Sequence, residues 1–223
     1  MKSVELHDRL NIELGKYLDL PNLGIKTTHK QYFLNKAIDI IFDEYYDAFE
    51  RNEVTRFGLG TLINNTTLTD DDTTANSEHP NGITFQLPQG HYYTIKEYVL
   101  YDEKYIKVQP ITYDYYNANI NNIRRKPYSK MFWRLGIGDD DVNTKNVYRE
   151  IIHDGSVIDQ SLLEYHMTYI SRPEKANFKN NTFVNLGHKP LQEAISRAVK
   201  LIYDYYGNRM NPQTEQVEQQ QNQ

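Results

Sequence analysis

Residues 93–108 read YTIKEYVLYDEKYIKV, and this stretch decides the fold class. Large apolar side chains alternate with polar ones on both sides of a polar turn at residues 102–104. Side chains that repeat every second residue lie on one face of a β-strand, and two such runs joined by a short turn form a hairpin. The stretch therefore predicts an antiparallel hairpin. Its alternating residues are Tyr93, Ile95, Val99, Tyr101, Ile106 and Val108.

Three later stretches, residues 131–137, 147–152 and 163–169, show the same alternation. The last ends at Arg172-Pro173, where proline stops a ladder. With the hairpin, these strands predict an antiparallel sheet. Residues 112–122 follow Pro110 and are rich in Tyr and Asn, which predicts a short helix or an irregular excursion between two strands.

Helical patterns flank the strands. Leucines four residues apart, at 6, 10 and 14, predict a short helix that ends near Gly15. A long helix is expected from Thr28 to Glu50, with Thr27 or Thr28 as its N-cap. Its wide apolar face indicates either a central core helix or a helix that also packs on a neighbouring subunit. A helix over residues 189–207 starts around Pro190 and ends at Gly207 as the C-terminal capping residue.

The patterns together predict an α+β fold, in which N-terminal helices and a C-terminal helix pack with an antiparallel β-sheet. We expect one domain over residues 1–207. Its predicted parts are a helical part at 1–63, a polar loop at 64–82, a mainly β part at 83–173 and the helix at 189–207, followed by a polar tail at 208–223. The loop either binds a partner or is a tolerated insertion, and the tail either binds a partner or is an idle terminus. The sequence leaves both alternatives open for each segment.

The composition excludes several kinds of site. The chain has no cysteine, so disulfides, thiolate metal sites and cysteine nucleophiles are excluded. Its net charge is 25 − 30 = −5, which is unfavourable for a protein that binds nucleic acid by neutralising phosphates. No catalytic motif, cofactor fingerprint or apolar stretch long enough to span a membrane is present, and no histidine pair has the spacing of helical metal ligands. We expect synthesis in the cytoplasm, no cofactor and no membrane partner.

One short stretch resembles a calcium loop. Asp139, Asp141, Asn143 and Glu150 fall at ligand positions of the twelve-residue pattern. Thr144 stands where the loop requires glycine, and the second half has the alternation of a strand. A polar hairpin turn is the favoured interpretation, with calcium as the alternative.

Aromatic and basic residues point to contacts with other proteins. The chain has 19 tyrosines and a single tryptophan, and tyrosine suits contacts that are partly wet. The triplet Arg124-Arg125-Lys126 precedes Tyr128, and arginine with aromatic residues dominates interface hot spots. The simpler interpretations are tyrosines at core edges and a solvated basic triplet.

Three central segments of the chain are residues 111–117 (ITYDYYN), 125–128 (RKPY) and 133–135 (WRL). They resemble virion proteins of crAss-like bacteriophages. Residues 33–37, 49–50 and 59–63 are similar to the N-terminal helical part of those proteins, and residues 169–173 to their C-terminal part. Together the segments span about two thirds of the chain.

The resemblance implies a subunit of a head-to-tail connector in the virion, a tail adaptor that forms a homo-oligomeric ring between portal and tail. Its partners would be the portal protein, other tail and ring proteins, and double-stranded DNA that passes through the channel without sequence-specific binding. It also implies that residues 113–116 and 124–128 lie at contacts with other proteins. The interface residues expected there are Tyr113, Tyr115, Tyr116, Arg124, Arg125, Lys126 and Tyr128.

Two other functions compete with this interpretation. A stand-alone module that recognises carbohydrate or protein would present exposed tyrosines in a patch or groove and stay monomeric. An enzyme would show one deep pocket with converging acids or histidines. We rank the enzyme last.

Overall fold

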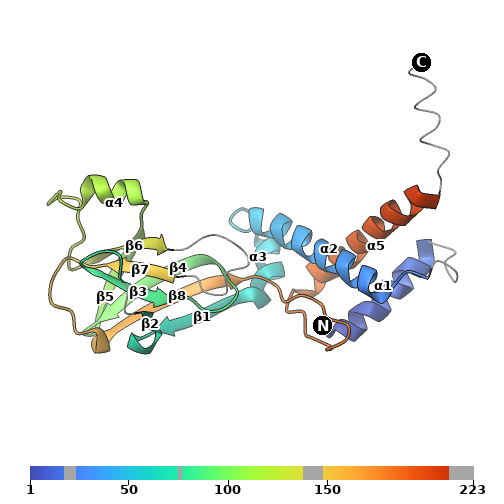
Figure 1. The fold of residues 1–223 in the computed structure, drawn as a ribbon, viewed down its shortest axis with the longest axis horizontal. Coiled ribbons are helices and arrows are strands. Elements are labelled where there is room, and N and C mark those ends of the chain that lie inside the picture. Colours follow the sequence, from blue (N-terminus) through green and yellow to red (C-terminus); the bar gives the residue numbers. More distant parts are fainter. Residues whose placement is uncertain (18–23, 75–76, 138–147, 211–223) are drawn as a thin grey trace, which may run out of the picture. The chain divides into compact units, whose positions relative to one another are not determined.

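The computed structural model describes residues 1–17, 24–74, 77–137 and 148–210 (Figure 1). The chain divides into two compact units. A helical unit consists of Met1–Leu62 and Arg172–Gln223, and a β unit, Ile63–Ser171, is one continuous segment inserted between them. The fold class is α+β, as predicted from the sequence. That both units fold as one domain over residues 1–207 stays a prediction.

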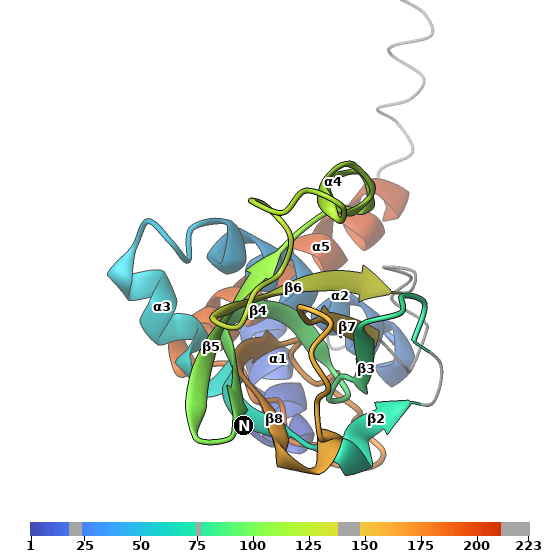
Figure 2. The ribbon, with the colours of Figure 1, turned by 90° about the vertical axis from the view of Figure 1, so that its left-hand side faces the viewer.

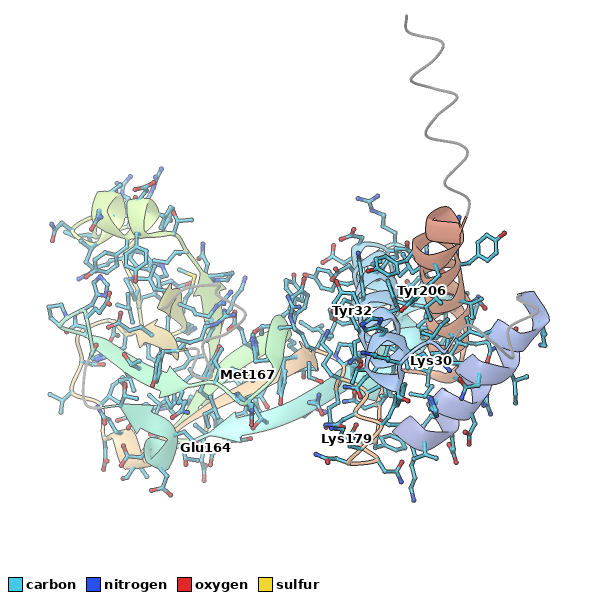
Figure 3. All side chains as sticks on the ribbon, turned by 45° about the vertical axis from the view of Figure 1, so that its right-hand side comes forward. Lys30, Tyr32, Glu164, Met167, Lys179 and Tyr206 are labelled. Atoms are coloured by element: carbon cyan, nitrogen blue, oxygen red, sulfur yellow. The ribbon has the colours of Figure 1, made fainter. Side chains whose placement is uncertain are left out.

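The helical unit is built on contacts between its long helices. These are α1 (Ser3–Tyr17), α2 (Thr27–Asp47), α3 (Glu53–Leu59) with the turn η1 (Gly60–Leu62), and α5 (His188–Met210). α5 packs against both α2 and α1. At the start of α2, the ring of Phe33 lies 5.4 Å from that of Tyr205 on α5, and His29 Nδ1 lies 2.5 Å from Oη of Tyr206, which Figure 3 labels. None of the described helices is long and apolar enough to cross a membrane.

Two predicted helix boundaries are wrong. The N-cap residue of α2 is Lys26, and no side chain caps the helix, so neither Thr27 nor Thr28 is the cap. α5 continues through Gly207 to Met210, because glycine in a helix costs only about 1 kcal/mol and ends one mainly where the next turn needs a left-handed residue. Residues 208–210 of the expected tail therefore belong to α5, and residues 211–223 lie outside the described residues.

An irregular strap, residues 172–187, is tied to the helices by side chains. The side-chain amide of Asn35 on α2 both donates to the carbonyl of Ala176 at 3.0 Å and accepts from its N–H at 2.8 Å. Buried Ser3 donates from Oγ to the carbonyl of Thr182 at 2.7 Å. Because polar groups inside a fold must be paired, these bonds allow a segment without regular structure to be part of the core.

The β unit is one curled sheet of eight strands in the order β1-β8-β4-β5-β6-β7-β3-β2. The ring centroids of Phe85 on β3 and Tyr165 on β8 are 5.4 Å apart, although each strand is second from an opposite end of that order. The sheet thus curls around a core that these two strands share. The strands are β1 (Ile63–Leu68), β2 (Thr73–Thr74), β3 (Gly82–Gln86), β4 (His91–Tyr101), β5 (Lys104–Pro110), β6 (Met131–Ile137), β7 (Tyr148–Ile152) and β8 (Leu163–Ser171).

The predicted hairpin is confirmed. β4 and β5 pair antiparallel, with Tyr101 opposite Lys104. Asp102 and Glu103 both have positive φ, 47° and 61°, which is the backbone of the tight two-residue turn that joins twisted strands. The sheet is not purely antiparallel, however, because β5 and β6 pair in parallel.

The prediction of a long loop over residues 64–82 is wrong. Most of its first part is strand β1, which pairs with β8 from Ile63 opposite Ile170 to Leu68 opposite Tyr165. The short helix η2 (Asp70–Asp72) and β2 follow, and residues 75–76 lie outside the described residues. The stretch looked like a loop because β1 is an edge strand that buries only Leu68, and a backbone ladder does not need apolar side chains.

Candidate functional site

The connection between β5 and β6, residues 111–130, carries every residue that the sequence predicts at an interface, and we call it the crossover cap. Parallel neighbours need a connection that returns to the same end of the sheet, so the chain must cross one of its faces. The helix α4 (Tyr113–Asn119) is capped by Thr112, whose Oγ1 accepts the N–H of Tyr115 at 3.2 Å. Figures 1 and 2 show α4 standing on the side of β6.

The inner side of the cap packs on a small apolar cluster formed by Trp133, Leu135 and Ile152. The ring of Tyr115 lies 5.6 Å from that of Trp133, edge to face, and the ring of Tyr116 lies 6.3 Å from it. Tyr116 is only 9% exposed, and burial with the nearby charge of Glu150 raises its pKa. The two tyrosines hold the cap on the sheet, which leaves Tyr116 little surface for a partner.

Beneath the cap lies a fully buried carboxylate, Glu150 on β7. Its Oε1 accepts the N–H of His79 at 2.9 Å, and its Oε2 lies 2.6 Å from Nδ1 of His79. Ser77 Oγ donates to the same carboxylate, and the ring of His79 lies 4.1 Å from that of Tyr116. The carboxylate thus anchors the turn before β3 under the cap. Ser77 Oγ bonds to Glu150 and to the backbone carbonyl of His79, not to the imidazole ring, so the cluster lacks the aligned hydroxyl and imidazole of a nucleophilic site.

The calcium alternative loses one ligand. Asp139, Asp141 and Asn143 lie outside the described residues. Glu150, the remaining residue of that pattern, uses both carboxylate oxygens within the turn anchor. Within the described ranges, no group of three or more histidine, aspartate or glutamate side chains is placed to hold a metal ion.

The outer side of the cap is exposed and basic. Arg124, Arg125 and Lys126 are exposed, and none of them forms an ion pair with the described part of the chain. Ile123 and Tyr128 flank them with 85% and 51% of their surfaces exposed. Tight backbone bonds hold this segment, since the carbonyl of residue 122 accepts from residues 125 and 126 at 2.9 and 2.8 Å.

Tyr113 lies between the two sides. It is 42% exposed, and its hydroxyl donates to Glu78 Oε2 at 3.2 Å. Burial and the charge of Glu78 raise its pKa. The cap therefore brings all the predicted interface residues together on one connection. Of these residues, Tyr115 and Tyr116 face the sheet, and the others face solvent.

The family model described as phage tail ring protein 3/4, of crAss-like phages, matches residues 1–187. The chain belongs to this family. No curated protein matches it. The match includes the whole β unit with its crossover cap and ends one residue before α5. The resemblance read from the sequence is confirmed, and the family is one of structural virion components, not a class of enzyme.

The ring protein has a second polar network, inside the curled sheet. Arg134 Nε on β6 lies 2.9 Å from Glu97 Oε1 on β4, with side chains only 16% and 9% exposed, and the hydroxyl of Tyr165 donates to Glu97. Burial raises the pKa of Glu97, which the charge of Arg134 opposes. Burial also lowers the pKa of His91 to about 4, with Arg134 adding to the effect. The Glu97–Arg134 pair joins β4 and β6, which are not adjacent in the sheet.

A shallow polar hollow of about 220 Å³ lies over β1, β8 and β4 of the ring protein. Tyr98 stacks on His166 at 4.7 Å with an interplanar angle of 11°, and His166 Nε2 lies 2.8 Å from Glu164 Oε2. Figure 3 marks Glu164 and Met167 on β8. The residues around the hollow are Asn65, Thr66, Thr67, Lys96, Tyr98, His166, Met167 and Thr168.

Sequence reasoning considered Glu150 only as a calcium ligand, and it missed the buried contact of Glu150 with His79 and the Glu97–Arg134 pair. A signal existed for the first, because Glu150 alternates with Ile152 and so shares its face of the strand. An acid on an apolar face predicts a buried partner. No comparable signal marked His79, which is brought to Glu150 only by the pairing of β3 with β7.

Proposed function

We propose that this tail ring protein is a subunit of the head-to-tail connector, where it forms a closed ring between portal and tail around the path of double-stranded DNA. The match to the tail ring family carries the proposal. A closed ring needs two different patches on each subunit, each complementary to the other. The exposed side of the crossover cap supplies a candidate for one of them.

The residues proposed at contacts are those of the cap that face solvent. Tyr113, Arg124, Arg125, Lys126 and Tyr128 offer guanidinium, ammonium and phenol groups on a segment that is rigidly bonded to the sheet. The arginine and tyrosine side chains among them are of the types that dominate binding energy at protein interfaces. Tyr115 and Tyr116 act indirectly in this proposal, by fixing the cap to the sheet.

The charge of the chain supports DNA passage without binding. A net charge of −5 gives no general attraction to phosphates, so DNA would slide past the ring and not adhere to it. The basic triplet on the cap is too small to reverse this balance, and in the proposal it faces a protein partner.

Cryo-electron microscopy of the full chain mixed with the portal and tail proteins of the same genome tests the proposal. We expect closed rings of the protein between portal and tail components. A chain that stays monomeric, with no density on the portal or on any tail protein, would refute it.

The C-terminal residues provide a second test. We propose that residues 211–223, rich in Gln, Asn and Glu, act as an arm that docks on the portal or the next ring. Their deletion should weaken assembly on the portal and leave the unfolding curve of the chain unchanged. Unchanged assembly would remove this role.

The polar hollow favours one other function, recognition of a carbohydrate. Its hydroxyl, amide and imidazole groups beside an aromatic ring suit a saccharide. Binding of the isolated chain to a glycan array, abolished by Tyr98→Ala, would support a stand-alone module. A lack of glycan binding by a ring-forming chain would exclude it.

A further inference from the structure

The crossover cap concentrates positive charge. Residues 111–130 contain four basic side chains, Arg124, Arg125, Lys126 and Lys130, against one acid, Asp114, which gives 4 − 1 = +3 in a chain whose net charge is −5. We call the exposed residues Ile123, Arg124, Arg125, Lys126 and Tyr128 the basic patch. With Ile123 and Tyr128 at its two ends, the patch combines cations with apolar surface.

A second patch of opposite charge lies where two short helices meet. η2 (Asp70–Asp72) follows β1, and η3 (Gln160–Leu162) precedes β8. Because Leu68 pairs with Tyr165, the end of β1 lies beside the start of β8, which brings η2 and η3 together. Exposed residues here form what we call the acidic patch: Asp70, Asp71, Asp159 and Leu162.

The acidic patch is also free of ion pairs within the described residues, and 54% of the surface of Leu162 is exposed. Its backbone is fixed, since Asp159 accepts the N–H of residue 161 at 3.1 Å and Asp72 accepts that of residue 69 at 3.0 Å. Both patches thus offer unpaired charge and apolar surface on rigid turns.

The two patches lie on opposite sides of the β unit. Figures 1 and 2 both show the cap with α4 on one side of the curled sheet and the connections next to β2 and the start of β8 on the other. A patch on each side is what a ring of identical subunits requires, because every subunit must contact one neighbour through each patch. Contact between two identical patches would instead place like charges together.

We propose that neighbouring subunits of the ring meet through these surfaces, the basic patch of one subunit on the acidic patch of the next. The inference rests on the ring function proposed above and names the contact that closes the ring. Exposed ion pairs contribute little to affinity, so their role is to select the partner patch and its orientation. Ile123, Tyr128 and Leu162 supply the apolar centre of the contact.

The absence of cysteine from the chain makes the contact directly testable by cross-linking. The double variant Ile123→Cys/Leu162→Cys is oxidised, or treated with a short bis-maleimide, in the assembly formed on the portal. We expect a ladder of covalent dimers, trimers and larger species up to the ring. A mixture of the two single variants should give dimers only, and either single variant alone should give none.

Charge exchange gives an independent readout. The variant Arg124→Glu/Arg125→Glu/Lys126→Glu has two acidic patches, and Asp70→Lys/Asp71→Lys has two basic ones. Each alone should lose ring formation by about tenfold or more, and an equimolar mixture should recover it through alternating subunits. Lys104→Glu/Lys107→Glu, at exposed positions of β5 outside both patches, is the matched control and should assemble normally.

The outcomes separate this inference from the proposed function. Rings that form without a cross-link between positions 123 and 162, and with no recovery in the mixture, would overturn the contact and leave the ring function standing. Dimers from the Ile123→Cys variant alone would show that the basic patch contacts its own copy, which also overturns it. A chain that assembles on no partner at all would refute both.

Discussion

Glu150 on β7 is fully buried, and its Oε2 lies 2.6 Å from Nδ1 of His79 in the turn before β3. The pair sits under the crossover cap, because the ring of His79 also contacts Tyr116 of α4. A carboxylate without water is costly unless its oxygens are bonded, and here both are. The shape of the proposed assembly surface therefore depends on a polar pair that lies beneath it.

Replacement of the carboxylate should destabilise the β unit strongly. Glu150→Ala leaves the N–H and ring of His79 and the hydroxyl of Ser77 without their acceptor, at a cost of about 3 kcal/mol in the free energy of unfolding. Urea unfolding followed by fluorescence measures the loss. The only tryptophan of the chain, Trp133, is buried under the cap and reports on this region directly.

A surface carboxylate provides the comparison. Glu164 lies 2.8 Å from His166 Nε2, but its side chain is 45% exposed, so Glu164→Gln should cost less than about 1 kcal/mol. Equal losses in the two variants would show that burial of Glu150 has no special role.

Gly82 should not accept a side chain. A Cβ at this position would lie 1.9 Å from Glu150 Oε1 and 2.4 Å from Ser77 Oγ, so Gly82→Ala must displace the anchored turn. We expect a loss of about 2 kcal/mol and a shift in Trp133 emission. Gly136 on β6 is the matched control, because a Cβ there meets nothing within 4 Å, and Gly136→Ala should change stability by at most about 0.5 kcal/mol. Similar effects at both glycines would contradict the packing of the anchor.

Stability should fall on mild acidification because of His91. Folding lowers the pKa of this histidine from 6.5 to about 4, so the unfolded chain takes up the proton first as the pH falls. The contribution of neutral His91 is complete above about pH 6.5 and is lost toward about pH 4. Glu97, whose pKa is raised by burial, acts in the opposite direction, since folding favours its protonated form.

Comparison with a variant isolates the histidine. Wild type and His91→Gln share Glu97, Arg134 and Tyr169 around the site, so their difference in unfolding free energy reports His91 alone. Urea titrations across this pH range should show wild type losing stability relative to the variant. Parallel curves would mean that His91 titrates normally in the folded protein.

The sequence predicted elements whose signal is local. The alternation around Tyr93 and Val99, the turn at Asp102 and Glu103, and the apolar face of α2 all depend on residues near in sequence, and the structure confirms each. Such patterns follow from the periodicity of strands and helices alone.

Features that depend on distant partners were not predictable in this way. β1 was mistaken for loop because its pairing with β8, about a hundred residues later, is carried by the backbone and leaves no apolar pattern. The sequences of β5 and β6 also carry no local pattern that indicates parallel pairing. In the site, the crossover cap could be located from Tyr113 to Tyr128, but which tyrosines face the sheet follows only from Trp133 beneath them.

The prediction of a single domain can be tested with two probes that report on different units. Trp133 lies in the β unit, Ile63–Ser171, whereas the long helices α1, α2 and α5 belong to the other unit and dominate the helical circular dichroism signal. If residues 1–207 fold as one domain, the urea transitions of tryptophan fluorescence and of helical dichroism should coincide. The β unit is a continuous insertion that joins the helical unit at residues 62 and 172. Unfolding of the β unit would therefore remove the constraint between these two positions of the helical unit. Two separated transitions would instead establish two independent domains, and would place the Glu150 and Gly82 effects in the fluorescence transition alone.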